Sequence, residues 1–359
     1  MIRAAFYAPM KPPTHPVPSG DRTMAQAILQ ALSLGGIDTD LASELQTRDG
    51  AGDAQVQAAR HEKAAREVAR LIPAGQAAGW RVWITYHNYY KAPDLIGPVV
   101  ADALKIPYLL VEATRARKRL QGPWAGYAQA AEAATDAAAI VFYLTSHDSA
   151  ALQAYGAASQ RLVHLRPFLP RKDLPPTPTT KRKGLLSVGM QRHGDKLASY
   201  RLIADSLAAL KTEGWTLNIA GDGPAHAEVK TMMAPFGKQV AFLGALRPTE
   251  MQRAYKDAAL LLWPGVNEAF GMTYLEAQAQ GLPVVAQDRP GVRDVLAPGA
   301  AYPDPSLGAP ALAARLDFLL ANPKLIAHLG AEARQHIARH HLLGPAAETL
   351  KQTIIEVLQ

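Results

Sequence analysis

The chain has 359 residues, 48% of them hydrophobic and 19% charged, and this composition and length are typical of a soluble globular protein of two domains. It contains no cysteine, which excludes disulfides and cysteine-based metal or nucleophile chemistry, and no apolar run approaches the roughly 20 residues that span a membrane. The net charge of +7 favours anionic partners such as nucleotide diphosphates. We expect a cytoplasmic protein that does not bind nucleic acid, because no nucleic-acid-binding signature accompanies the charge.

Strand-like and helix-like segments alternate through the first half, as in an α/β domain with a parallel sheet. The predicted elements, in chain order, are a strand at 3–8, a helix at 22–34, a helical stretch at 51–71, a strand at 81–86, a helix at 95–104, and strands at 108–112 and 139–145. They predict a first doubly wound, Rossmann-like domain over residues 1–170.

Five prolines crowd residues 167–180 without apolar periodicity, so this segment is predicted to be an extended linker. A second alternating series follows it, which predicts a second doubly wound domain over residues 181–344. Its predicted elements are strands at 184–189, 217–220, 240–243, 258–263 and 283–286, with helices at 197–210 and 271–280.

The most informative segment is residues 264–286, which follow a predicted strand and enter a predicted helix. Glu268 precedes this helix, and Glu276 lies eight residues later, inside it. In a strand–loop–helix unit of a parallel sheet, the loop and the first helical amides face the ligand crevice and favour an anion. A nucleotide sugar fits this arrangement, because the two carboxylates can accept hydrogen bonds from its hydroxyl groups while the helix N-terminus binds its phosphates.

The string EAFGMTYLEAQAQGLPVVA, from Glu268 onward, resembles the E-x7-E motif of glycosyltransferase family 4, the retaining enzymes of GT-B fold. The resemblance implies two Rossmann-like domains facing across a cleft, with the first on the acceptor side, the second binding the donor, and a final helix at about 345–359 packing back on the first. It implies a retaining, hexosyltransferase-like enzyme of polysaccharide or glycoconjugate biosynthesis. Such an enzyme moves a sugar from a nucleotide-diphosphate donor to a hydroxyl acceptor with no metal and no cofactor.

Within this motif, the resemblance assigns Glu268 to the hydroxyls of the transferred sugar, as a catalytic residue, and Glu276 to the ribose of the donor. Gly271, Met272 and Thr273 stand where the helix begins, so their amides are expected to contact the donor.

A second candidate site is the string SVGMQRHGDK at 187–196, which holds two cations before a predicted helix. A diphosphate leaving group needs positive charge where its bond breaks, and Arg192 with Lys196 supply that charge without a metal. The family's usual version has an arginine directly after the glycine, but here Met190 follows Gly189. We expect Lys196 and Arg192 to be catalytic and Gly189 to contact the donor.

Two further loops of the second domain resemble donor-binding segments of the family. The string IAGDGP at 219–224 resembles a loop whose glycines let the backbone approach the nucleotide, which implies Gly221 and Gly223 as donor contacts. The string FLG that ends at Gly244 resembles a segment bordering the base, which implies that Gly244 and Leu246 line that pocket.

The first domain carries fewer matches to the family pattern. A proline-rich loop leads to Gly20, expected to approach the donor, and to Arg22, a weak acceptor-side candidate. His87 follows a predicted strand where similar enzymes carry a catalytic histidine, and Tyr89 beside it suits a sugar ring. After the next strand the family commonly has another histidine, whereas this chain has Glu112, which becomes the candidate acceptor contact.

The densest basic cluster is formed by Arg115, Arg117, Lys118 and Arg119, just after a predicted strand end. We expect it to touch an acidic membrane surface, as peripheral contact, or an anionic acceptor, the alternative being a solvated face. The acceptor itself, whether a saccharide, a lipid-linked glycan or a small molecule, stays open. The histidines show no metal-ligand spacing, so no metal site is expected.

Two alternatives to an active glycosyltransferase stay open. Met190 and Glu112 replace residues usual in the family. One alternative hypothesis is therefore a catalytically impaired subunit that binds nucleotide sugar and partners an active enzyme. The other alternative is a different nucleotide-sugar enzyme of GT-B fold.

Overall fold

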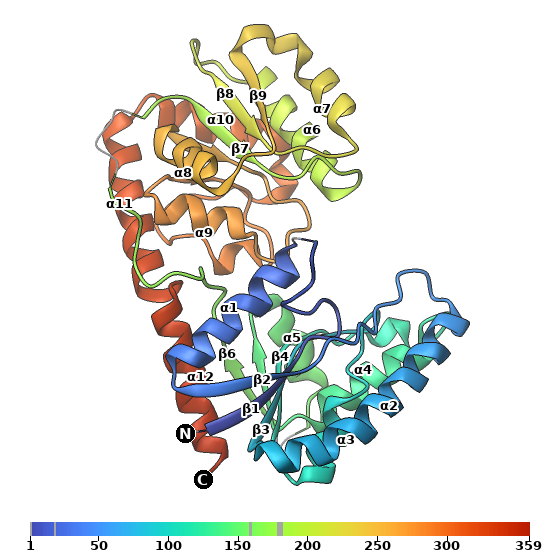
Figure 1. The fold of residues 1–359 in the computed structure, drawn as a ribbon. Helices are drawn as coiled ribbons and strands as arrows, with labels where there is room; N and C mark the ends of the chain where they lie inside the picture. Colours follow the sequence, from blue (N-terminus) through green and yellow to red (C-terminus); the bar gives the residue numbers. More distant parts are fainter. Residues whose placement is uncertain (1, 18, 158–159, 178–181) are drawn as a thin grey trace. The chain divides into compact units, whose positions relative to one another are not determined.

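The computed structural model describes residues 2–17, 19–157, 160–177 and 182–359. It divides into two compact units, one formed by Met1–Pro170 with Leu343–Gln359 and the other by Arg171–Leu342. The division falls inside the predicted linker, of which residues 178–180 lie outside the described residues, as does residue 181, where the second domain was expected to begin. Each unit is an α/β layer structure with its own parallel sheet (Figure 1).

The first unit holds a six-stranded sheet of order β2-β1-β3-β4-β5-β6, in which every neighbouring pair is parallel. The strands are β1 (Ile2–Tyr7), β2 (Ile37–Ser43), β3 (Val82–Asn88), β4 (Tyr108–Ala113), β5 (Ile140–Tyr143) and β6 (Arg161–His164). The helices are α1 (Gly20–Leu34), α2 (Ala54–Ala78), α3 (Gly97–Leu104), α4 (Ala125–Ala137), α5 (Ser146–Tyr155) and α12 (Leu343–Val357).

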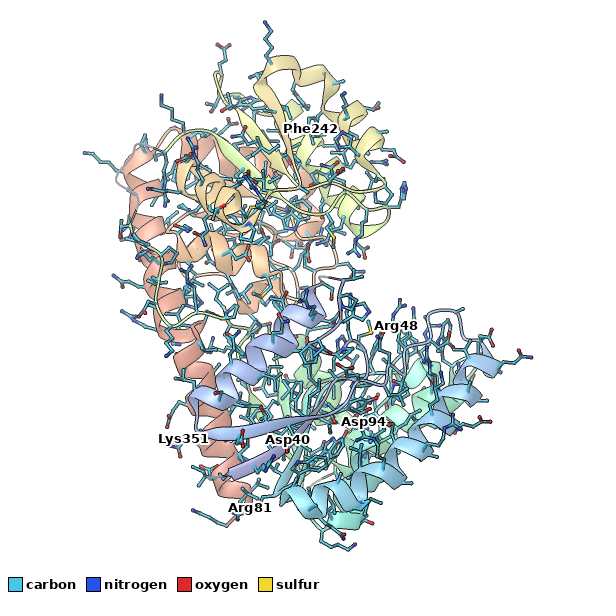
Figure 2. All side chains as sticks on the ribbon, in the orientation of Figure 1. Asp40, Arg48, Arg81, Asp94, Phe242 and Lys351 are labelled. Atoms are coloured by element: carbon cyan, nitrogen blue, oxygen red, sulfur yellow. The ribbon has the colours of Figure 1, made fainter. Side chains whose placement is uncertain are left out.

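The core of the first unit follows the near-continuous apolar runs of β1, β3 and β4, which helices cover on both faces. The buried carboxylate of Asp94, labelled in Figure 2, links parts of this core. Asp94 accepts hydrogen bonds from the hydroxyl of Tyr108 at 2.8 Å and from the amide of Gly97 at 2.7 Å. The last helix, α12, packs against α1, so the C-terminal segment completes the first unit (Figure 1).

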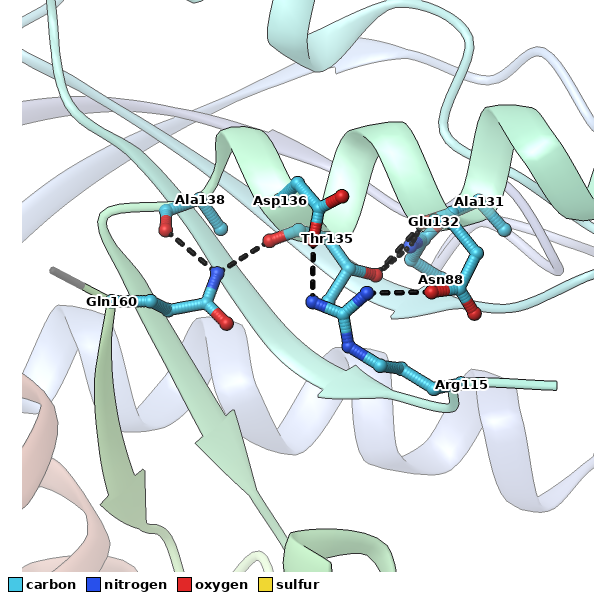
Figure 3. Close-up of polar contacts among 8 residues, drawn as sticks. All are labelled: Asn88, Arg115, Ala131, Glu132, Thr135, Asp136, Ala138 and Gln160. Carbon is cyan, nitrogen blue, oxygen red and sulfur yellow. Dashed lines mark hydrogen bonds and ion pairs between the residues drawn. The ribbon is translucent and has the colours of Figure 1, made fainter. Parts of the chain in front are cut away.

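Arg115 has a structural role that contradicts the prediction of a lipid or acceptor contact at this position. Its side chain is only 2% exposed and pairs with Glu132 at 2.5 Å and Asp136 at 2.6 Å, both on α4 (Figure 3). The neighbouring Asn88 donates to the carbonyl of Ala131 on the same helix at 2.9 Å. The Arg115 ion pairs hold α4 to the loop after β4, because a buried arginine needs carboxylate partners, and the Asn88 bond holds α4 to β3.

Several elements of the first unit were not predicted from the sequence. They are β2, α4, α5 and β6. In β2, three consecutive polar residues break the apolar pattern, which an edge strand tolerates. The strand predicted at 139–145 is shorter than expected, because Thr145 instead caps α5 by accepting the amide of Asp148 at 3.3 Å.

The second unit holds a five-stranded parallel sheet of order β11-β10-β7-β8-β9. Its strands are β7 (Leu185–Val188), β8 (Leu217–Ala220), β9 (Val240–Gly244), β10 (Leu260–Leu262) and β11 (Val284–Val285). Its main helices are α6 (Asp195–Ala208), α7 (His226–Met233), α8 (Pro248–Asp257), α9 (Met272–Ala279), α10 (Gly308–Leu320) and α11 (Pro323–His340). Among the described residues, no helix combines the length and apolarity needed to cross a membrane.

Candidate functional site

The two glutamates of the motif lie at the carboxyl end of β10, the strand next to the centre of the second sheet. Glu268 belongs to the loop between β10 and α9, and Glu276 lies within α9. Gly271 precedes this helix with a φ of 81°, and no side chain caps the helix there. The amides of Met272 and Thr273 have no acceptor within the described part of the chain, which leaves them available to an anion.

Glu268 is held by two donors that approach the same carboxylate oxygen. Lys196 Nζ forms an ion pair with Glu268 Oε1, and Trp263 Nε1 donates to that oxygen at 2.9 Å. The side chains of Lys196 and Glu268 are 19% and 13% exposed, and Lys196 Nζ lies 5.3 Å from the centre of the Trp263 ring. No described residue donates a hydrogen bond to the second oxygen of Glu268, so that oxygen can accept one from a ligand hydroxyl.

This ion pair lines a small polar pocket of about 270 Å³. The pocket is formed by residues from the loop before α6, from α6 and from the loop after β10: Arg192, His193, Asp195, Lys196, Val266, Asn267 and Glu268. The fold thus brings together Arg192, Lys196 and Glu268, which the sequence predicted in two separate motifs. Arg192 is exposed there, with its guanidinium open to a bound anion.

Glu276 has a different environment from Glu268. It is exposed, and the hydroxyl of Tyr255 donates to Glu276 Oε2 at 2.8 Å. The same hydroxyl lies 2.8 Å from Oγ1 of Thr273, one turn earlier on α9. Tyr255 is buried in α8, so a fixed group orients both side chains that face the predicted ribose site. Sequence reasoning did not assign this role to Tyr255.

Three glycines of the second unit, Gly189, Gly221 and Gly223, lie where an added Cβ would clash with a neighbouring loop or ring. A Cβ added at Gly189 would lie 2.5 Å from the Trp263 ring, and one added at Gly221 would lie 2.0 Å from the carbonyl oxygen of Gly189. A Cβ added at Gly223 would lie 2.4 Å from the carbonyl oxygen of Gln191. The loops after β7 and β8 therefore pack backbone to backbone. Donor contacts at these three glycines stay predictions, as do those at Gly244, which ends β9, and at Leu246 just after it.

In the first unit, His87 and Glu112 lie side by side at the carboxyl ends of β3 and β4. His87 Nδ1 lies 2.9 Å from Asp21 Oδ1 in the first turn of α1, and the His87 side chain is 16% exposed. Burial alone lowers the pKa of His87, but the charges of Glu112 and Asp21 and the Asp21 hydrogen bond raise it to about 9. His87 is therefore an imidazolium at neutral pH, and its Nε2 has no hydrogen-bond partner in the described chain.

Three non-glycine residues adopt left-handed backbone conformations near the carboxyl ends of parallel strands. They are His87 with a φ of 66°, Glu112 with a φ of 62° and Asn267 with a φ of 54°. Such conformations are unfavourable for L-residues and concentrate at functional sites. They mark the same two strand-end regions in which the sequence placed candidate site residues.

The remaining first-unit candidates lie on neighbouring loops. Gly20 is the first residue of α1, and an added Cβ there would meet no atom within 4 Å, so packing does not require glycine. Arg22 is engaged by the proline-rich loop, because its Nε donates to the carbonyl of Pro13 at 3.4 Å. Pro18 of that loop lies outside the described residues. Tyr89 packs on the His87 ring with centroids 4.9 Å apart.

No group of three or more His, Asp or Glu side chains in the described ranges is placed to hold a metal ion.

Residues 181–336 match the family described as glycosyl transferases group 1. This match covers most of the second unit. A GDP-mannose-dependent alpha-mannosyltransferase of Mycolicibacterium smegmatis is 37% identical over 82 residues, which are 23% of this chain and 21% of that relative. The chain thus matches about a fifth of that relative's length. The predicted resemblance to glycosyltransferases is confirmed.

Solved structures extend the similarity to both units. A sucrose-phosphate synthase from Thermosynechococcus elongatus aligns with a TM-score of 0.70 at 17% identity, over 99% of each chain. Anabaena HepE, solved with UDP and glucose, aligns with a TM-score of 0.68 at 15% identity, over 99% of this chain and 100% of that one. At these identities the likeness shows the fold alone, and it confirms the predicted GT-B fold around the group 1 domain.

Proposed function

We propose that this protein is a retaining glycosyltransferase that moves a sugar from a nucleotide-diphosphate donor to a hydroxyl acceptor. The observation that carries this proposal is the pairing of Lys196 with Glu268 in one polar pocket at the carboxyl end of the second sheet. A cation for the diphosphate and a carboxylate for the sugar hydroxyls are thereby held side by side. The group 1 family match and the UDP-bound neighbour support a nucleotide donor.

In the proposed complex, Glu276 accepts hydrogen bonds from the ribose hydroxyls, oriented by Tyr255. The open amides of Met272 and Thr273 and the cations Arg192 and Lys196 bind the diphosphate. The second oxygen of Glu268 accepts a hydroxyl of the transferred sugar. The two amides and the second oxygen of Glu268 have no partner among the described residues, whereas Lys196 and Glu276 are already oriented by Glu268 and Tyr255.

The proposed reaction takes place on one face of the sugar. The bond between the anomeric carbon and the β-phosphate oxygen breaks as the acceptor oxygen bonds to that carbon, and the acceptor proton passes to the departing phosphate oxygen. Negative charge grows on the leaving phosphate, where Lys196 and Arg192 stabilise it in the transition state. This route needs no protein nucleophile, and the same cations supply the charge that a metal ion would provide.

His87 is proposed to act from the first unit as a fixed imidazolium. Its Nδ1 is bound to Asp21, so only Nε2 remains to donate a hydrogen bond to a substrate oxygen. Glu112, in the place where similar enzymes carry a histidine, keeps His87 charged.

The proposal is tested by incubating the purified chain with UDP-, GDP- and ADP-sugars and measuring both thermal stabilisation and sugar release. A ligand at about 100 times its dissociation constant adds about 2.7 kcal/mol to the free energy of unfolding, which a melting screen resolves. We expect one nucleotide class to stabilise the protein and its sugar to be released with retained configuration. Stabilisation without release or transfer would favour the impaired-subunit alternative, which Met190 at the usual arginine position motivates.

A further inference from the structure

A row of aromatic rings extends through the first unit from the end of β3 to the start of α4. It consists of His87, Tyr89, Tyr90 and Trp124, with successive ring centroids 4.9, 5.5 and 5.8 Å apart. His87 and Tyr89 are tilted by 34°, and Tyr90 meets Trp124 edge to face at 89°. We call these four residues the aromatic row. Each is half-buried, which fixes its ring while leaving part of it accessible.

Two cations lie over the far end of the aromatic row. Lys91 Nζ is 5.7 Å from the Tyr90 ring centre and 5.4 Å from that of Trp124. The Arg119 guanidinium carbon is 5.3 Å and 5.4 Å from the same two centres. Both cations are within cation–π range of both rings. The aromatic row thus ends in a fixed doubly positive site.

Neither cation is neutralised by the part of the chain that the structure describes. Among the described residues, no carboxylate lies within 4 Å of Lys91 Nζ or of the Arg119 guanidinium. Arg115, by contrast, has two carboxylate partners. The Nε of Arg119 is buried without a hydrogen-bond partner. Partly buried positive charges without counterions are unfavourable, and an anion bound from solution would neutralise them.

The position of the aromatic row in the fold indicates a substrate site. Tyr90 and Lys91 lie in the loop after β3, and Arg119 and Trp124 lie in the segment after β4. Both segments leave the carboxyl edge of the parallel sheet, where open α/β sheets bind their ligands. The row begins at His87, the imidazolium that the proposed reaction uses.

We infer that the aromatic row binds an acidic oligosaccharide, the acceptor of the proposed glycosyltransferase, so this inference rests on the proposed function. Aromatic faces pack on the apolar faces of sugar rings, and a row of them fits several linked sugars. Lys91 and Arg119 pair with a carboxylate, sulfate or phosphate on the acceptor. The accepting hydroxyl then lies at the His87 end.

An acidic membrane is the less suitable occupant. Membrane-surface sites present mobile basic side chains together with exposed apolar residues. Here Arg119 and Lys91 are half-buried and held over rings, and Tyr90 and Trp124 are half-buried as well. Cations held in fixed positions suit an anionic group at a defined place on an oligosaccharide better than the mobile headgroups of a membrane. Lys118, between Arg117 and Arg119, is exposed and has no ring contact among the described residues, so it is a matched control.

The test measures binding of oligosaccharides by calorimetry, with no donor present. The probes are neutral, glucuronate-containing and sulfated oligosaccharides of equal length, together with vesicles of phosphatidylglycerol and phosphatidylcholine. We expect an acidic oligosaccharide to bind at least about tenfold more tightly than its neutral counterpart. Arg119→Gln, Lys91→Gln and Trp124→Ala should each weaken that binding about tenfold, whereas Lys118→Gln should leave it unchanged. Arg119→Lys should retain part of it.

Three results would overturn the inference: equal binding of neutral and acidic oligosaccharides, equal losses in Lys118→Gln and Arg119→Gln, or binding to vesicles alone. Arg119→Gln keeps every ring of the aromatic row, so it remains informative if Trp124→Ala fails to fold, as a thermal melt will show. Donor hydrolysis is measured separately. If nucleotide sugars are neither bound nor cleaved while acidic oligosaccharides bind, the proposed function fails and the binding site stands.

Discussion

Lys196 and Glu268 form an ion pair between α6 and the loop after β10, although they are 72 residues apart in the sequence. The pair joins the cation expected at the diphosphate to the carboxylate expected at the sugar, and Trp263 contacts both. The two charged side chains of the pocket are therefore already positioned in the ligand-free protein, because each charge orients the other.

Lys196→Ala is expected to lower the turnover number more than it lowers donor affinity. Charge on the leaving phosphate grows in the transition state, so its stabilisation by Lys196 appears mainly in kcat. Steady-state kinetics with the donor found in the melting screen measure both quantities. Lys238→Ala, at an exposed site outside the lining of the pocket, is the control. A raised KM with unchanged kcat would contradict a role at the leaving group.

The two glutamates are expected to differ in their effect on free nucleotide. Glu276→Ala should weaken binding of the nucleoside diphosphate as well as the intact donor, because Glu276 is assigned to the ribose. Glu268→Ala should weaken binding of the donor only. Loss of a charge-assisted hydrogen bond costs about 1.5 to 3 kcal/mol, which calorimetry resolves. If both variants fold and bind nucleotide and donor normally, the assignment of this motif is wrong.

Tyr255→Phe is expected to lower nucleotide affinity in the same way as Glu276→Ala, but by a smaller amount. The hydroxyl of Tyr255 is removed while its ring still fills the core, so Glu276 and Thr273 lose their shared partner. Nucleotide affinity should fall by about 1 kcal/mol, and the turnover number should stay near the wild-type value. The double variant Tyr255→Phe with Glu276→Ala should be no weaker than Glu276→Ala alone, and additive losses would place Tyr255 in a separate role.

His87 is expected to make stability depend on pH. Its pKa is raised to about 9 in the folded protein, against an ordinary value near 6.5, so the folded state binds the proton more tightly than the unfolded state. This stabilisation is complete below about pH 6.5 and is lost as the pH rises through about 9.

The full effect on the free energy of unfolding is about 3 kcal/mol. Urea titrations of wild type and His87→Gln at about pH 6 and pH 10 should show the wild-type advantage shrinking at the higher pH. A constant difference would mean that His87 is not an imidazolium in the folded protein.

Glycosyl transfer is expected to survive EDTA. Arg192, Lys196 and the first amides of α9 supply the positive charge that the proposed reaction needs at the diphosphate. Rates measured with EDTA, and with Mg²⁺ or Mn²⁺ added back, check this expectation. Complete loss on chelation with recovery on adding metal would show that the leaving group depends on a metal ion.

The sequence by itself predicted the alternating α/β pattern, the two-domain organisation and the motif containing Glu268 and Glu276. These features are local, because strand and helix periodicities, glycine turns and an eight-residue spacing are all read within a short window. The sequence did not predict β2 or α4, because an edge strand tolerates polar residues and an alanine-rich helix carries little periodic signal.

The tertiary structure decided which charges pair with which partners. Arg115, Lys118 and Arg119 form part of one basic run in the sequence, yet Arg115 is buried against α4, Lys118 is exposed and Arg119 lies over two aromatic rings. Likewise, only the folded sheet brings Lys196 to Glu268. Glu268 lies 72 residues from Lys196, and Tyr90 follows β3 whereas Arg119 follows β4. These side chains meet because parallel strands end at one edge of each sheet. A pattern within a short stretch of sequence cannot predict such contacts between side chains.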